Sequence, residues 1–214
     1  MPHTLTITKE VYAFDELDNR AKERARAWFR EGALDYDWWY AVYDDAAQCA
    51  EILGINLQQK PVKLMNGTTR YDPCIWFSGF SSQGDGACFE GSYSYAKGCR
   101  TKIREHAPED TKLARIADEL TVVQRRHFYR LQATVKHRGH YYHSRCTDIK
   151  VYDREDNYRD IDDAAEEVAE LLRDFMDWIY RQLEAEYYWL LADEQVDDSI
   201  RANEYEFTED GQRA

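Results

Sequence analysis

Residues 74–95 read CIWFSGFSSQGDGACFEGSYSY, and this stretch decides the fold class. It holds two short runs, 74–80 and 87–95, whose composition and period favour strands over helices. Apolar and polar side chains alternate in the second run, as in a half-buried antiparallel strand. Four of the chain's 10 glycines lie between Gly79 and Gly91, in and beside the segment that joins the runs. We therefore predict a strand-to-strand connection rather than a strand that leads into a helix.

The rest of the chain alternates helical and strand patterns. Apolar residues at spacings of three and four predict amphipathic helices, and β-branched or alternating segments predict short strands. We expect helices over 15–32, 35–53, 96–126 with a break near 107–108, 162–191 and 194–202, and strands over 5–12, 55–57, 61–64, 130–137, 140–152 and 205–207. The predicted fold is α+β, an antiparallel sheet of hairpins packed by an N-terminal helical hairpin and a long C-terminal amphipathic helix.

Length and composition indicate one packed domain over residues 1–214. The chain is long enough to bury a core without disulfides or metals, and its 16 Tyr, 8 Phe and 6 Trp are untypical of disorder. Its 5 cysteines are odd in number and form no CxxC pair, so we expect reduced thiols and no cofactor. No leader or membrane-spanning pattern is recognised, which predicts a cytoplasmic protein.

The formal net charge of −13 is unevenly distributed. From Asp148 onward the chain has 22 Asp and Glu against 7 Lys and Arg, whereas residues 97–145 have 12 Lys and Arg against 5 Asp and Glu. Such a distribution bears on the choice of partner. A surface that resembles a phosphate backbone could bind a basic groove on another protein, although a charge run more often serves as a solvated helix face. The acidic candidates are Asp153, Glu155, Asp156, Asp160, Asp162, Asp163, Glu166, Glu167, Glu170, Asp174 and Asp177.

The glycine-rich segment is the second candidate site. A ligand could meet free backbone N–H groups and the Asp85 carboxylate there, but the same glycines also suit a structured hairpin connection. No Lys lies nearby and no helix follows directly, which disfavours a nucleotide-binding P-loop. The candidate binding residues are Ser81, Ser82, Gln83, Gly84, Asp85, Gly86 and Glu90.

A histidine-rich run, HRGHYYHSRC over residues 137–146, is the third candidate. With Arg138 and Gly139 as a two-residue hairpin turn, the histidines and Cys146 do not converge, so we predict no metal site. The hairpin could instead contact nucleic acid through cations and stacking aromatic rings, which the overall acidity disfavours. The basic candidates are Lys136, His137, Arg138, His140 and Arg145.

Nothing in the sequence fixes a catalytic constellation. Cys88 could pair with a histidine as a nucleophile, but its place in an alternating strand is more typical of a buried thiol. Whether the protein is an enzyme stays open, and a non-enzymatic role is favoured.

Several stretches together resemble a family of small proteins encoded by bacteriophages and prophages, some of which carry an antitoxin-like label. They are FSGFSSQGDGACFEG at 77–91, FDEL at 14–17 with Ala21-Lys and Trp28-Phe, KHRGHY at 136–141 and ANEYEFTEDG at 202–211. The resemblance implies an accessory protein that acts in the host cytoplasm by binding defence machinery, as anti-CRISPR proteins do. It supplies no catalytic residues. The leading hypothesis is a non-enzymatic inhibitor that covers a basic surface of a host nucleic-acid-handling protein. The alternatives are a ligand-binding protein or enzyme that uses the loop 79–91, and a nucleic-acid-binding protein that uses the hairpin 130–146.

Overall fold

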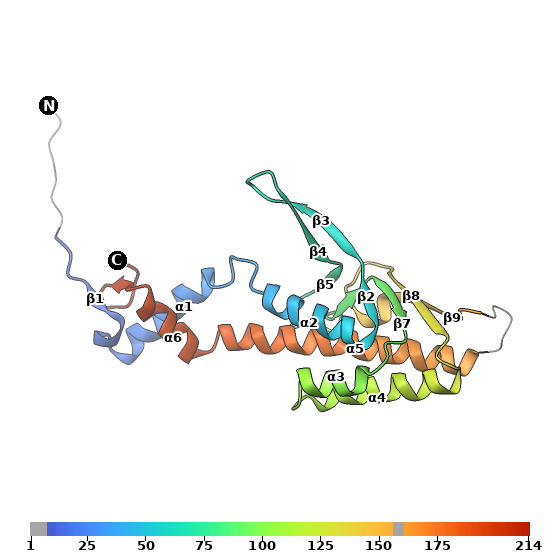
Figure 1. The fold of residues 1–214 in the computed structure, drawn as a ribbon. Coiled ribbons are helices and arrows are strands. Elements are labelled where there is room, and N and C mark those ends of the chain that lie inside the picture. Colours follow the sequence, from blue (N-terminus) through green and yellow to red (C-terminus); the bar gives the residue numbers. More distant parts are fainter. Residues whose placement is uncertain (1–7, 156–160) are drawn as a thin grey trace. The chain divides into compact units, whose positions relative to one another are not determined.

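The computed structural model describes residues 8–155 and 161–214, and it confirms the α+β class (Figure 1). The chain divides into two compact units. The central unit comprises residues 39–184, and the terminal unit is built from both ends of the chain, 1–38 and 185–214. That residues 1–214 form a single domain stays a prediction.

A four-stranded antiparallel sheet lies at the centre of the central unit. Its order is β2 (Ile55–Leu57), β7 (Gly91–Ser94), β8 (Leu131–His137) and β9 (Thr147–Asp153). Two hairpins accompany it, β3 (Gln59–Lys63) with β4 (Thr69–Pro73) and β5 (Ile75–Phe77) with β6 (Ala87–Phe89). In β8, alternate side chains are buried, as one face of a sheet requires.

Four helices complete this unit: α2 (Tyr40–Leu53), α3 (Cys99–His106), α4 (Thr111–Arg126) and most of α5 (Asp162–Leu190). The gap between α3 and α4 contains the predicted break at Pro108, and Asp110 then caps α4 by accepting a hydrogen bond from the Leu113 N–H at 2.8 Å. The predicted apolar stripe of α5, from Val168 to Leu183, is buried. None of the helices in the described residues has the length and apolar composition that a bilayer crossing requires.

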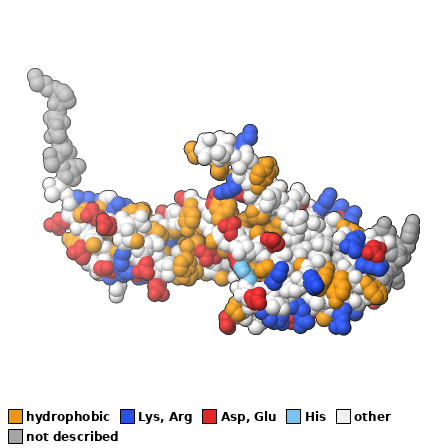
Figure 2. Space-filling view, in the orientation of Figure 1, with side chains coloured by type: hydrophobic (Ala, Val, Ile, Leu, Met, Phe, Trp, Pro, Cys, Tyr) orange, Lys and Arg blue, Asp and Glu red, His pale blue; other side chains and the backbone are white. Residues whose placement is uncertain are grey.

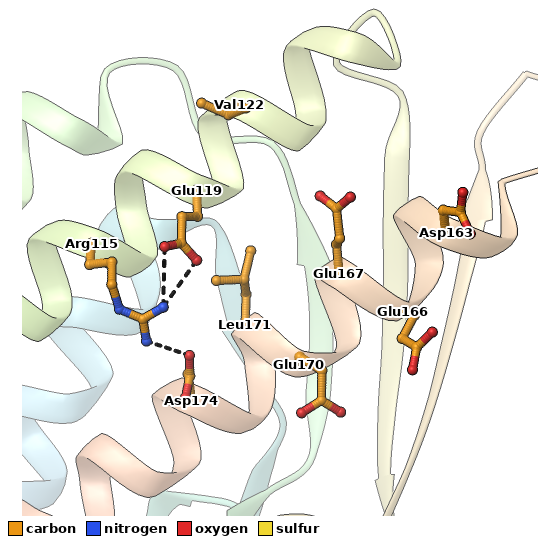
Figure 3. A pocket seen from close by; sticks show the side chains of 9 residues that line it. All are labelled: Arg115, Glu119, Val122, Asp163, Glu166, Glu167, Glu170, Leu171 and Asp174. Carbon is orange, nitrogen blue, oxygen red and sulfur yellow. Dashed lines mark hydrogen bonds and ion pairs between the residues drawn. The ribbon is translucent and has the colours of Figure 1, made fainter.

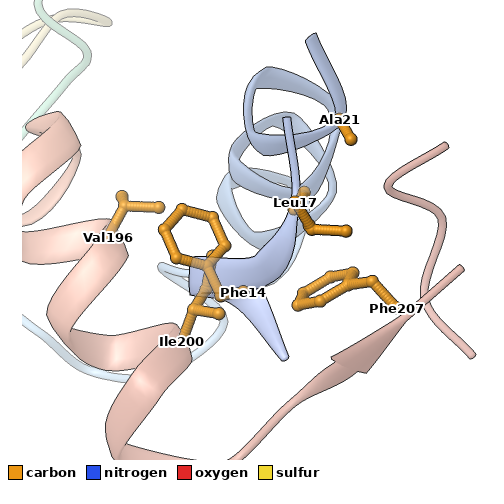
Figure 4. Close-up of a cluster of buried hydrophobic side chains, with 7 residues drawn as sticks. Phe14, Leu17, Ala21, Val196, Ile200 and Phe207 are labelled. Carbon is orange, nitrogen blue, oxygen red and sulfur yellow. The ribbon is translucent and has the colours of Figure 1, made fainter. Parts of the chain in front are cut away.

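The terminal unit contains β1 (Tyr12–Ala13), the 3₁₀ helix η1 (Phe14–Glu16), α1 (Asn19–Gly32), α6 (Asp193–Ala202) and β10 (Glu206–Phe207). Strands β1 and β10 pair antiparallel, which joins the two ends of the chain. A separate cluster of buried side chains lies beneath them (Figure 4): Phe14, Leu17, Ala21, Ala25, Val196, Ile200 and Phe207. Arg26 adds a bidentate ion pair with Asp197, with N–O distances of 2.6 and 2.7 Å.

Several predicted elements differ from the structure, and the helix expected over 35–53 begins only at Tyr40. The strand expected over 5–12 lies partly outside the described residues, and of its described part only Tyr12 is in a strand. The strand expected over 87–95 is divided at Glu90 between two sheets. A Cβ on Gly91 would lie 2.3 Å from the Asn56 carbonyl oxygen, so glycine is required where β7 meets β2.

The prediction of a two-residue turn at Arg138 and Gly139 was wrong. His137 pairs with Thr147, and residues 138–146 form a nine-residue connection that includes the 3₁₀ helix η2 (Ser144–Cys146). The polar and aromatic residues of this connection also occur in strands, so their composition did not reveal the early end of pairing.

Candidate functional site

A groove lies on the central unit between α4 and α5 (Figure 3). Its volume is about 780 Å³. The lining residues are Arg115, Glu119, Val122, Asp163, Glu166, Glu167, Glu170, Leu171 and Asp174. Six of these nine side chains are carboxylates and only one is cationic, so the groove is strongly acidic.

The acidic side of the groove comes from one face of α5. Its carboxylates recur at spacings of three and four residues, which places them on adjacent turns of the helix. The structure brings these α5 carboxylates together with Arg115 and Glu119 of α4. All five are among the acidic candidates: Asp163, Glu166, Glu167, Glu170 and Asp174. The sequence prediction missed the α4 residues because that helix lies within residues 97–145, where Lys and Arg outnumber Asp and Glu. We call these residues the basic segment.

Arginines of the basic segment neutralise part of the negative charge of the α5 carboxylates. Arg115 forms ion pairs with Asp174 at 2.5 Å and with Glu119 at 3.1 Å. Arg126 pairs with Glu167 of α5. Figure 2 shows the Lys and Arg side chains gathered along α3 and α4. The basic segment therefore partly serves the fold, by binding the acidic helix beside it.

Glu170 has two cationic partners. Arg145, from the connection between β8 and β9, lies 2.7 Å from its carboxylate, and Arg173 lies 2.6 Å away. Partial burial opposes ionisation, but the hydrogen bonds from the two guanidinium groups lower the pKa of Glu170 overall. Glu170 therefore stays ionised to a lower pH than an isolated glutamate does.

Asp163 and Glu166 are exposed carboxylates with no ion pair to any residue that the structure describes. Val122 adds an apolar contact surface, since 56% of it is exposed, and Leu171 points from α5 toward α4 (Figure 3). The groove thus combines available negative charge with apolar surface, which suits a cationic amphipathic segment.

The other acidic candidates are dispersed. Asp153 is buried, with 1% exposed, and its carboxylate accepts a hydrogen bond from the Glu155 N–H at 2.9 Å. Glu155 pairs with Arg130. Asp162 begins α5, and Asp177 is exposed further along that helix. Asp156 and Asp160 lie outside the described residues. Asp153 is thus not part of an acidic surface.

The glycine-rich segment is a strand-to-strand connection, as predicted, since β5 pairs with β6. Asp85 accepts hydrogen bonds from the N–H groups of Ser82 at 2.7 Å and Ser81 at 2.8 Å, and these lower the pKa of its carboxyl. The carboxylate therefore serves to close the loop. Ser81, Ser82 and Gln83 are exposed at its tip. Ligand binding by this loop stays a prediction.

The structure brings this loop against the histidine-rich connection 138–146. A Cβ on Gly86 would lie 2.9 Å from His143 Cδ2, and a Cβ on Gly84 would lie 3.3 Å from Tyr141. Glu90 adds a contact next to this packing, since its Oε1 accepts a hydrogen bond at 3.1 Å from the N–H of His137, the last residue of β8. At least Gly86 is therefore explained by packing between two connections.

The cations of the basic hairpin are only partly available. Arg138 pairs with Asp148 at 3.0 Å and Arg145 with Glu170, whereas Lys136 and His140 are exposed. Tyr142 stacks on Trp76 at a ring distance of 6.2 Å. Nucleic-acid binding by this hairpin stays a prediction.

Comparisons with known proteins identify a family and no activity. Residues 38–193 match the profile of a domain of unknown function, DUF8835. No curated protein and no solved structure matches the chain significantly. The matched range contains the whole of the central unit, including the acidic groove. The chain therefore belongs to the DUF8835 family.

Proposed function

We propose that this protein is a non-enzymatic binding protein whose acidic groove between α4 and α5 receives a basic segment of a partner. The observation that carries the proposal is the groove itself, with six carboxylates, one guanidinium and an exposed Val122 in its lining. Proteins that handle nucleic acids present basic surfaces to phosphates, and a row of carboxylates can occupy the same surface. The partner proposed is a nucleic-acid-handling protein.

The cellular setting belongs to the same proposal. The resemblance to phage and prophage proteins supports a role in the cytoplasm of a bacterial host, where the protein would inhibit a defence complex in the manner of an anti-CRISPR protein. Inhibition would follow from occlusion, because a basic surface of the partner that is covered by the carboxylates of this protein no longer binds its nucleic acid. No catalytic step is required.

The test is affinity capture from host lysate at about 0.1 M and about 1 M salt, with identification of the retained protein. The Debye length falls from about 10 Å to about 3 Å over this range, so a charge-driven complex is retained at the lower concentration and lost at the higher. We expect the retained protein to bind nucleic acid, and we expect this protein to displace that nucleic acid.

The groove is tested with the double variant Asp163→Lys, Glu166→Lys. Both side chains are exposed and neither has an ion pair with a described residue, so the reversal breaks no ion pair among the residues that the structure describes. We expect the affinity for the captured protein to fall by about tenfold or more, because two attractions worth up to about 1 kcal/mol each become repulsions.

The matched control is Glu194→Lys, Glu209→Lys. It changes the net charge by the same amount at two exposed positions of the terminal unit. This control should retain most of the affinity. Equal losses in the two double variants, or capture that is unaffected by salt, would contradict the groove as the binding site.

A further inference from the structure

A second cluster of chemically active side chains lies on the central unit, away from the residues that line the groove. Asp45 and Cys49 are four residues apart on α2, so they share one helix face. His106 is the last residue of α3. One ligand atom from each, a carboxylate oxygen, the thiol sulfur and an imidazole nitrogen, all lie within 4.8 Å of one another.

These three donors have the chemistry of a zinc site. Zn²⁺ binds thiolate, imidazole and carboxylate at about 2.0–2.3 Å, and a tetrahedral arrangement places the donor atoms about 3.3–3.6 Å apart. His106 Nε2 and Asp45 Oδ1 are 2.8 Å apart, so they must separate by about half an ångström, while the thiol lies within 4.8 Å of both and must approach by at most about 1.3 Å. Side-chain rotation supplies movements of this size. The thiol excludes Mg²⁺ and Ca²⁺, which prefer oxygen ligands.

The surroundings favour a cation. Cys49 is fully buried, and the carboxylates of Asp45 and Asp110 lie close enough to its thiol to act on it through their charge. A divalent cation bound at the cluster would offset these carboxylate charges. The carbonyl groups at the end of α3, where His106 lies, also favour positive charge.

The cluster is reachable from solvent. The side chains of His106 and Asp45 are 27% and 50% exposed, whereas the thiol of Cys49 is buried. Three protein ligands leave one position of a tetrahedral ion open on the outer side, as in zinc sites that bind water or a substrate.

We propose that Asp45, Cys49 and His106 bind one Zn²⁺ ion, with its fourth position open to water or to an exogenous ligand. The loss of the thiol proton on binding makes the bound ion and its two anionic ligands neutral overall. Asp110 is near but already engaged, because Oδ1 accepts from the Leu113 N–H and Oδ2 from Trp178 Nε1 at 2.6 Å. It would act on the site through its charge, without joining the coordination sphere.

The test is a titration of the purified full-length chain, stripped with a chelator, with Co²⁺ as a visible probe. We expect one equivalent of Co²⁺ to produce the intense visible bands of a tetrahedral ion and a thiolate-to-cobalt charge-transfer band. Zn²⁺ should then bleach both, because it binds more tightly. Calorimetry in buffers of different ionisation enthalpy should show about one proton released per ion, from the Cys49 thiol.

Variants assign the ligands. Cys49→Ala should abolish the charge-transfer band and weaken Zn²⁺ binding by more than about 100-fold, and His106→Gln and Asp45→Asn should each weaken it by tenfold or more. The control is Cys88→Ala, because Cys88 is as fully buried as Cys49 and is not one of the three proposed ligands. It should bind Co²⁺ as the parent does.

Circular dichroism and the thermal midpoint show that each variant is folded before binding is compared. The proposal is overturned if the folded parent gives no tetrahedral Co²⁺ spectrum, or if the charge-transfer band survives in Cys49→Ala. Loss of the band in Cys88→Ala with retention in Cys49→Ala would equally overturn it.

Discussion

Replacement of Gly86 by alanine tests whether the glycine-rich connection is constrained by packing. The new Cβ would lie 2.9 Å from His143 Cδ2, 3.1 Å from His143 Cα and 3.1 Å from the Tyr142 carbonyl oxygen. Carbon atoms in contact normally lie about 3.5–4.0 Å apart. Two of the three atoms belong to the backbone, so the connection 138–146 has to move. We expect a loss of about 1–3 kcal/mol in the free energy of unfolding, the usual cost of overpacking.

The control for this variant is Gly79→Ala in the same connection. Its Cβ would lie 3.4 Å from Asp85 Oδ2, an ordinary contact, and Gly79 is exposed. Alanine at an unstrained glycine position stabilises by about 0.4–1 kcal/mol, because it restricts the unfolded chain. The two variants are thus expected to shift stability in opposite directions.

Urea unfolding followed by circular dichroism measures both variants against the parent. Hydrogen exchange adds a local readout, because the Arg138 N–H donates to the Cys146 carbonyl and the Cys146 N–H to the His143 carbonyl, both at 2.8 Å. We expect these amides to exchange faster in Gly86→Ala. Equal stabilities of the two variants, with unchanged exchange, would refute the packing explanation and leave a ligand as the reason for glycine there.

Two further predictions concern pH and the terminal unit. The folded-state pKa of Asp85 is lowered, so its carboxylate contributes stability that is present above the unfolded value of about 4 and is lost as pH falls through the folded value. Asp85→Asn should therefore lower the thermal midpoint near neutral pH and approach the parent below pH ~4; a gap that is constant with pH would contradict this. Phe207→Ala empties the centre of the terminal cluster, where Phe207 is fully buried, and should cost about 3–5 kcal/mol. Hydrogen exchange should rise in α1 and α6 before it rises in β8, and a uniform rise would argue against a separate terminal core.

The helices were largely predictable because their signals are local. The apolar stripe from Val168 to Leu183 repeats with helical period, and Pro108 marks the break between α3 and α4 within a single turn. The connection between β5 and β6 was predictable for the same reason, since glycine and polar residues separate two apolar runs. These patterns can be recognised without knowing which distant residues pack against the element.

The site depended on contacts between distant parts of the chain. Arg126 and Glu167 pair across 41 residues, and His106 and Asp45 across 61, so no local pattern indicates either contact. The net charge of the basic segment gave no sign that its arginines partly neutralise α5. The acidic face of α5 itself was readable from the spacing of its carboxylates, but the opposing Glu119 and Val122 were not.

The construction of the terminal unit from residues 1–38 and 185–214 has a consequence for biosynthesis. A chain emerges from the ribosome at about 5–20 residues per second, so the first 38 residues wait several seconds or more for the segment that completes their core. Phe14 and Leu17 have no Val196, Ile200 or Phe207 to pack against in that interval. The central unit is one continuous stretch of the chain, so its synthesis is complete before residues 185–214 are made. Translation thus sets an order of assembly in which the central unit forms first and the two ends of the chain close last.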